Sequence, residues 1–223
     1  MQDVMVSRIS LLLVLCDCPL LKSVSLDIDN SEFQESDNCT ITDLFDCLRV
    51  VENLSIGFGA IEFFAQGVFP QELPITLDHL KYLCLKDICF IHNYGLPVLA
   101  LLIKSSLNLG KLKIEILDDS WVEVSERRDS FTLEDDFDVW MVHLNELEIT
   151  NLVYRNLELD FVKLVLAKSP VLKKVRIFLN NEVTEDEALD VLGTLKQTPH
   201  ASPSVEVIVE VIEGSCTSSR SVM

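Results

Sequence analysis

A short hydrophobic phrase recurs along the chain and restricts the folds that the chain can adopt. Its form is apolar-x-x-apolar-x-apolar, and it begins at Leu21, Val51, Leu80, Leu109, Leu144 and Leu172. The intervals between successive phrases are 30, 29, 29, 35 and 28 residues. Alternate side chains of a strand face opposite ways, so the apolar residues of each phrase form one face that is buried, and the residues between them form the opposite face, which is exposed. Because no single repeat can bury its own apolar face, neighbouring repeats must stack.

The pattern predicts an α/β protein with a leucine-rich-repeat architecture. We expect a right-handed solenoid of about six to seven irregular strand-plus-helix repeats with a period of ~29 residues. A last, degenerate strand is expected at residues 205–211, where valines alternate. Return helices are expected over residues 41–48, 96–106 and 157–168, and a fourth should follow the capping box at Thr184 and end near Gln197. Gly57-Phe58-Gly59 is expected to form a turn.

The spacing divides the chain into four segments. Residues 1–117 carry the first repeats, residues 118–138 an acidic insertion, residues 139–212 the terminal repeats, and residues 213–223 a tail expected to be disordered. The insertion contains nine acidic residues against two basic ones. Such a block repels itself, so we expect an exposed loop.

The net charge disfavours several classes of partner, and the cysteine pattern indicates the cellular location. The chain has 36 acidic and 18 basic residues, a formal net charge of −18. This balance disfavours binding to nucleic acid, which needs a basic surface, and docking on an anionic membrane. The seven cysteines form no regular disulfide or zinc pattern, which favours reduced thiols and a location in the cytoplasm or nucleus.

No arrangement of residues indicates catalysis. The sequence contains no phosphate-binding glycine loop and no nucleophile elbow. His79 and His143 each precede the first Leu of a repeat, which favours a structural role. The carboxylates within residues 134–138 lack the regular spacing of a calcium loop. We therefore expect the chain not to be an enzyme and to hold no cofactor or metal.

Outward strand positions are the candidate site, because solenoids bind partners with their exposed sheet surface. The predicted contact residues are Ser25, Asp27, Ser55, Cys84, Lys86, Lys113, Glu115, Glu148, Thr150, Lys174, Arg176 and Phe178. They combine charges and small residues with one aromatic side chain, which suits a protein partner. Lys173, Lys174 and Arg176 form one compact basic cluster, either a solvated strand edge or a contact for an acidic partner.

The carboxyl-terminal part resembles a known family. The resemblance is carried by residues 143–149, by residues 161–177 with the phrase Ser169-Pro170-Val171-Leu172-Lys173-Lys174, and by residues 201–207. These stretches resemble the FBD module of plant F-box/FBD/LRR-repeat proteins, and residues 80–89 and 103–109 resemble the repeats of that family. The resemblance implies that residues 139–212 form FBD-like repeats capping the solenoid. It also implies a module like the substrate-recognition part of a cullin-RING ubiquitin ligase, with a ubiquitination substrate as candidate partner.

One feature of the family is not found in the sequence. Family members begin with a Leu/Pro-rich F-box, which binds the ligase adaptor subunit, and nothing similar occurs here. We therefore expect that the chain does not recruit the adaptor. Two alternatives stay open. The chain is a truncated or degenerate gene product without independent function, or, as a less favoured reading, a receptor that binds a small hormone in its solenoid.

Overall fold

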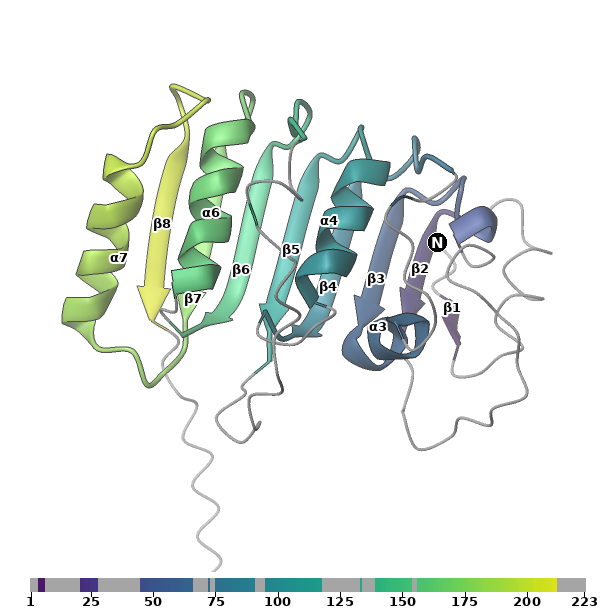
Figure 1. Ribbon diagram of the computed structural model, residues 1–223, viewed down its shortest axis with the longest axis horizontal. Helices are drawn as coiled ribbons and strands as arrows, with labels where there is room; N and C mark the ends of the chain where they lie inside the picture. Colours follow the sequence, from purple (N-terminus) through teal and green to yellow (C-terminus); the bar gives the residue numbers. More distant parts are fainter. Residues whose placement is uncertain are drawn as a thin grey trace, which may run out of the picture.

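A single parallel sheet organises the part of the chain that the structure describes. The computed structural model describes residues 4–6, 21–27, 45–65, 72, 75–90, 95–117, 133, 139–153 and 156–211. Its eight strands lie in sequence order, from β1 to β8, and every neighbouring pair is parallel (Figure 1). The predicted α/β class is confirmed, and the arrangement is consistent with a leucine-rich-repeat fold.

The strands pair the recurring phrases position for position. Their bounds are β1 (Val4–Val6), β2 (Ser23–Leu26), β3 (Asn53–Gly57), β4 (Tyr82–Ile88), β5 (Lys111–Ile116), β6 (Glu146–Leu152), β7 (Lys174–Leu179) and β8 (Glu206–Val211). One inward row runs Val24, Leu54, Leu83, Leu112, Leu147, Val175 and Val207. From Val24 to Val175 this row is at most 4% exposed, so stacking buries the apolar face that each strand could not bury alone.

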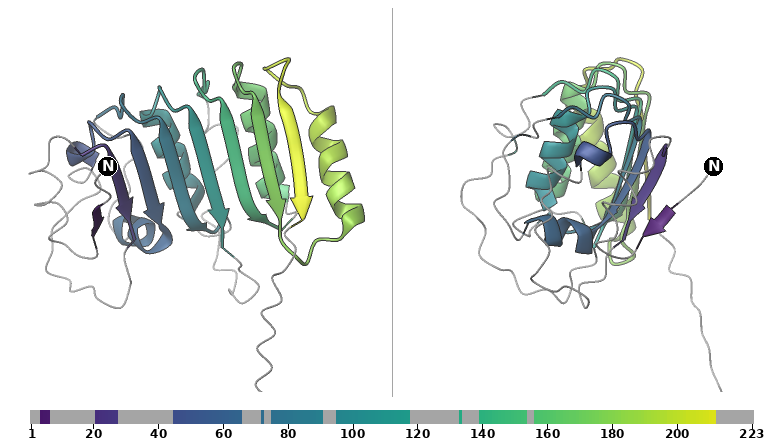
Figure 2. Two further views of the ribbon diagram at one scale, coloured as in Figure 1. Left: turned by 180° about the vertical axis from the view of Figure 1, so that it is seen from behind. Right: turned by 90° about the vertical axis from the view of Figure 1, so that its right-hand side faces the viewer.

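The described helices cover one face of this sheet, and none of them lies on the other face (Figure 2). The helices are α3 (Phe58–Ala65), α4 (Gly95–Ser105), α6 (Asn156–Lys168) and α7 (Glu185–Gln197). The helices predicted at residues 96–106 and 157–168 are confirmed, as is the capping box. Thr184 accepts a hydrogen bond from the Glu187 amide and donates its own amide to Glu187 Oε2 at 2.9 Å. This backbone donor lowers the pKa of Glu187.

Backbone hydrogen bonds repeat at the starts of β3 to β7 and hold neighbouring repeats in register. The amides of Glu52 and Asn53 both donate to the Lys22 carbonyl, at 2.8 and 2.9 Å. The same double donation recurs one repeat later at each step, to the carbonyls of Glu52, Lys81, Gly110 and Asn145. Each carbonyl therefore satisfies two amides at the entry to a strand, where an unpaired amide would be costly.

Several expectations are corrected by the fold. Gly57-Phe58-Gly59 is not a turn: Gly57 ends β3 and Phe58 begins α3. β1 is a strand that the phrases did not predict. Cys47 is disulfide-bonded, so the expectation of reduced thiols throughout is wrong for this residue, although Cys84 and Cys89 are free and buried.

Other expectations lie outside the described residues. They concern residues 41–44 of the first predicted helix, nearly all of the acidic insertion at 118–138, and the tail at 213–223. In the described part of the chain, no helix has the length and apolar character that crossing a bilayer would require.

Candidate interaction surface

The predicted contact residues gather on the sheet face opposite the described helices. Strand register places six of them in one outward row: Ser25, Ser55, Cys84, Lys113, Glu148 and Arg176. A second row pairs Glu115 with Thr150 and Thr150 with Phe178. None of the described helices lies over this face in the view from behind (Figure 2, left). We call these rows the outward face.

Glu148 is the centre of the charges on this face. Its carboxylate lies 3.5 Å from Lys113 Nζ, and 3.9 Å from both Lys111 Nζ and Arg176 Nη1. Lys113 Nζ also lies 2.8 Å from Glu115, and this hydrogen bond raises the pKa of Lys113. Because these groups keep partial access to water, each pair contributes only ~0.2–1 kcal/mol to stability. The charges can therefore change partners at little energetic cost.

The remaining predicted residues are placed less uniformly. Lys174 lies in a neighbouring row with Lys111 and Glu146. Lys86 is paired in register with Gly57, and Asp27 is exposed beside the same glycine. Phe178 is partly buried rather than fully exposed.

Cys84 belongs to the outward row but is only 4% exposed. Tyr82, in the same strand, hydrogen-bonds to it, and burial raises the pKa of the Cys84 thiol and that of the Tyr82 hydroxyl, the latter to about 12. The expectation that Cys84 offers an exposed side chain to a partner is therefore wrong. Its row neighbours are Ser55 and Lys113, and the recurring phrase does not report how far the surrounding side chains cover it.

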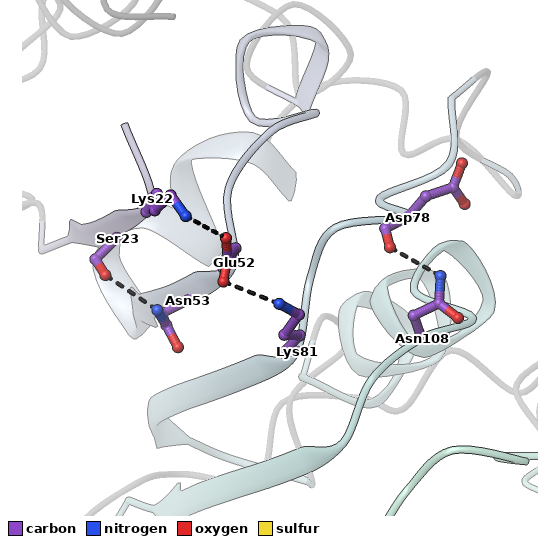
Figure 3. Close-up of polar contacts among 7 residues, drawn as sticks. All are labelled: Lys22, Ser23, Glu52, Asn53, Asp78, Lys81 and Asn108. Carbon is purple, nitrogen blue, oxygen red and sulfur yellow. Dashed lines mark hydrogen bonds and ion pairs between the residues drawn. The ribbon is translucent and has the colours of Figure 1, made fainter. Parts of the chain in front are cut away.

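A charged clamp at the edge where the strands begin was not anticipated. Glu52 accepts hydrogen bonds from Lys22 at 2.8 Å and from Lys81 at 3.0 Å (Figure 3). The hydrogen bond from Lys22, followed by that from Lys81, lowers the pKa of Glu52 to about 2. The sequence signal was available, since all three residues occupy the position directly before the strand in consecutive repeats.

The described residues offer no cluster of three or more His, Cys, Asp or Glu side chains that could hold a metal. The His79 and His143 side chains are both exposed, and the carboxylates of residues 134–138 lie outside the described part. The outward face thus presents charged and small side chains on a broad sheet, an arrangement suited to contact with another macromolecule.

Comparisons with known proteins point to one family. An F-box/FBD/LRR-repeat protein of Arabidopsis thaliana is 25% identical over 194 residues, which cover 85% of this chain and 46% of the relative. The chain thus spans about half the length of the curated relative that it matches. No protein-family model matches the chain, and no solved structure matches it significantly.

Proposed function

We propose that this chain, whose similarity supports a relationship to the plant F-box/FBD/LRR-repeat family, is a non-catalytic protein-interaction module. In this proposal its repeats form a right-handed leucine-rich-repeat solenoid, and the outward face binds a protein partner. The observation that carries the proposal is a sheet face that none of the described helices covers, with its charges centred on Glu148.

The chemistry of this face favours a protein over a small ligand. Cations and carboxylates alternate along the row Lys113, Glu148 and Arg176, at separations of 3.5 to 3.9 Å. Complementary charges of a partner can exchange with these pairs, which gives specificity and faster association rather than large affinity. A folded or extended protein surface can span several strands at once, as solenoid partners do.

The family relationship suggests the biological role of such a partner. The relative is named as an F-box protein. The family resemblance implies a module like the substrate-recognition part of a ubiquitin ligase. We assign to this chain the recognition surface only, with a ubiquitination substrate as candidate partner. Contact with the ligase adaptor subunit is not assigned to these residues.

Site-specific crosslinking tests the proposal. A photoreactive amino acid is placed at Thr150, on the outward face, and separately at Asp190, an exposed position of α7 on the helix side. Adducts in plant extract are identified by mass spectrometry, and the candidate is then produced in pure form for binding measurements. We expect a saturable complex and adducts from Thr150 that are absent from Asp190.

Charge reversal supplies the matched control. Arg176→Glu on the outward face should weaken the purified complex, whereas Lys163→Glu on α6, which removes an exposed pair with Asp160, should not. The proposal fails if adducts arise equally from both positions or if both reversals have the same effect. A small plant hormone that raises the melting temperature, without any protein adduct, would favour the receptor alternative instead.

A further inference from the structure

Three segments that each end directly before a strand expose apolar side chains and contain no acidic residue, and the first and third of them carry lysines. They are residues 104–110, 139–145 and 168–173, which lead into β5, β6 and β7 at the edge where the strands begin, uppermost in Figure 1. We call them the entry-turn patch. Its lysines are Lys104, Lys168 and Lys173. The lack of Asp and Glu is notable in a chain with 36 acidic residues and only 18 basic ones.

Large apolar side chains are exposed at this patch. Leu107 is 51% exposed, Trp140 57%, Val142 44% and Val171 41%. These four are most of the exposed large hydrophobic residues in the described part of the chain; the others are Val50, in the corresponding turn before β3, and Leu189 on α7. Apolar side chains gathered in one place with a polar rim mark interaction sites more often than scattered ones do.

The three turns lie against one another through backbone hydrogen bonds. The Met141 amide donates to the Lys168 carbonyl at 3.0 Å, which joins the second turn to the end of α6. The Asn145 amide donates to the Gly110 carbonyl at 2.7 Å, and the Lys173 amide donates to the Asn145 carbonyl at 2.8 Å. The apolar side chains therefore belong to one continuous edge, which spans three strands or ~10 Å.

Part of the positive charge has a structural explanation, and part does not. Lys104 and Lys168 lie in the last turns of α4 and α6, where a cation is favoured by the helix dipole. Lys173 is exposed, belongs to no helix and makes no ion pair with another described residue. Charge complementarity then selects an anionic partner for an edge that is also apolar.

We propose that the entry-turn patch binds an acidic amphipathic segment of a partner protein, with apolar residues on one face and carboxylates flanking them. The apolar face would cover Leu107, Trp140 and Val142, and the carboxylates would meet Lys104 and Lys173. The positive charge of the patch itself, rather than the net charge of −18, selects an acidic segment, and an anionic membrane is an alternative that the experiment distinguishes. This surface is separate from the outward face and does not rest on the function proposed for it.

A synthetic helix provides a defined probe. The probe is a peptide of ~14 residues, ~21 Å long as a helix, with Leu on one face and Glu on the flanks. Its control has the same composition in an order that abolishes the apolar face. In a Trp121→Phe background, Trp140 is the remaining tryptophan. We expect the peptide, but not its control, to shift the Trp140 emission to shorter wavelength and to bind more weakly as salt is added.

Matched variants locate the binding. Leu107→Ser with Val142→Ser should raise the Kd for the peptide about tenfold, whereas Leu189→Ser, at an even more exposed leucine of α7, should leave it unchanged. Lys173→Glu should weaken binding and reduce its salt dependence, whereas Lys86→Glu on β4 should not. All of these side chains are at least partly exposed, so melting curves should show that every variant folds.

Three outcomes would overturn the proposal. The peptide and its reordered control could bind equally, the control variants could weaken binding as much as the patch variants, or no binding could occur at all. Vesicles of phosphatidylserine and phosphatidylcholine are tested in parallel. If the chain co-sediments with these vesicles, if Leu107→Ser with Val142→Ser abolishes this co-sedimentation, and if the peptide does not bind, the patch is a membrane contact and the proposal is wrong.

Discussion

Asn180 donates its side-chain amide to the side-chain oxygen of Asn151, 29 residues earlier, at 2.6 Å. Asn151 in turn donates to the Ile116 carbonyl at 2.9 Å. Asn151 has a positive φ of 65° and lies where the register between β6 and β7 shifts. Asp87 occupies the equivalent place in β4, with a φ of 56°. A repeated bulge therefore ends these strands, and asparagine side chains join three repeats there.

Replacement of Asn151 separates hydrogen bonding from backbone conformation. Asn151→Ala removes both side-chain bonds and leaves a residue that disfavours positive φ, so we expect a loss of ~2–4 kcal/mol in the free energy of unfolding. Asn151→Gly removes the same bonds but adopts positive φ freely, so its loss should be smaller. Urea denaturation measures both. Equal losses would show that the left-handed conformation contributes nothing.

Two glycines should respond in opposite directions to alanine. A Cβ at Gly95 would lie 2.3 Å from the Cys89 carbonyl oxygen, whereas a Cβ at Gly193 would meet nothing within 4 Å. Gly95→Ala must displace backbone, and we expect a loss of ~1–3 kcal/mol. Gly193→Ala, inside α7, should stabilise the protein by ~0.5–1 kcal/mol. Thermal unfolding of the two variants measures the difference, and a destabilising Gly193→Ala would contradict this account of α7.

Two buried serines provide another matched pair. Ser105 donates its hydroxyl to the Leu101 carbonyl at 2.8 Å, whereas the hydroxyl of Ser169, which is 0% exposed, has no hydrogen-bond partner among the described residues. Ser105→Ala should cost ~0.5–1.5 kcal/mol, the usual value of one hydrogen bond. Ser169→Ala removes an unsatisfied polar group, so it should be neutral or stabilising. A clear destabilisation by Ser169→Ala would reveal a partner for that hydroxyl. Chemical denaturation measures the free energy of unfolding of both variants.

The clamp at Glu52 predicts a pH dependence with a defined sign. Its pKa is lowered from 4.5 to about 2 by Lys22 and Lys81. The folded state therefore binds this proton less readily than the unfolded state does. The contribution of Glu52 to stability is present above pH 4.5 and is lost as pH falls towards 2. An NMR titration of the Glu52 carboxyl carbon should give a midpoint near 2.

Removal of both lysines tests the cause of that shift. In Lys22→Ala with Lys81→Ala, the Glu52 midpoint should rise towards 4.5, because the two hydrogen bonds that lower it are gone. The exposed pair Arg49 and Asp46 serves as a control, since Arg49→Ala lies outside the clamp and should leave the Glu52 midpoint in place. A midpoint that does not respond to the loss of the lysines would rule out the clamp as its cause.

Much of the fold was predictable from local pattern, and the exceptions have physical reasons. The six phrases from Leu21 to Leu172, together with the alternating valines of residues 205–211, were enough to align the seven strands β2 to β8, because a period-two alternation and a buried face allow a single register. The turn predicted at Gly57-Phe58-Gly59 does not form, because α3 begins at Phe58 and packs against the sheet despite two glycines that favour turns. Tertiary packing overrides such local preferences.

The candidate site was predictable only in its positions. Strand alternation placed Lys113, Glu148 and Arg176 in one outward row. It did not show that Glu148 would be shared by three cations, or that Cys84 would be buried in the same row. Those facts depend on side chains of neighbouring strands, which are about 30 residues apart in sequence and ~4.8 Å apart in the sheet.

The sequence by itself determined the α/β class, the alternation of inward and outward residues and the capping box of α7, since each depends on residues close together in the chain. Only the tertiary structure decided how exposed each outward side chain is, which charges pair, and that the entry turns gather apolar side chains with lysines. The reason is that stacking brings together turns from successive repeats, and the exposure and electrostatics of a surface are properties of that assembly.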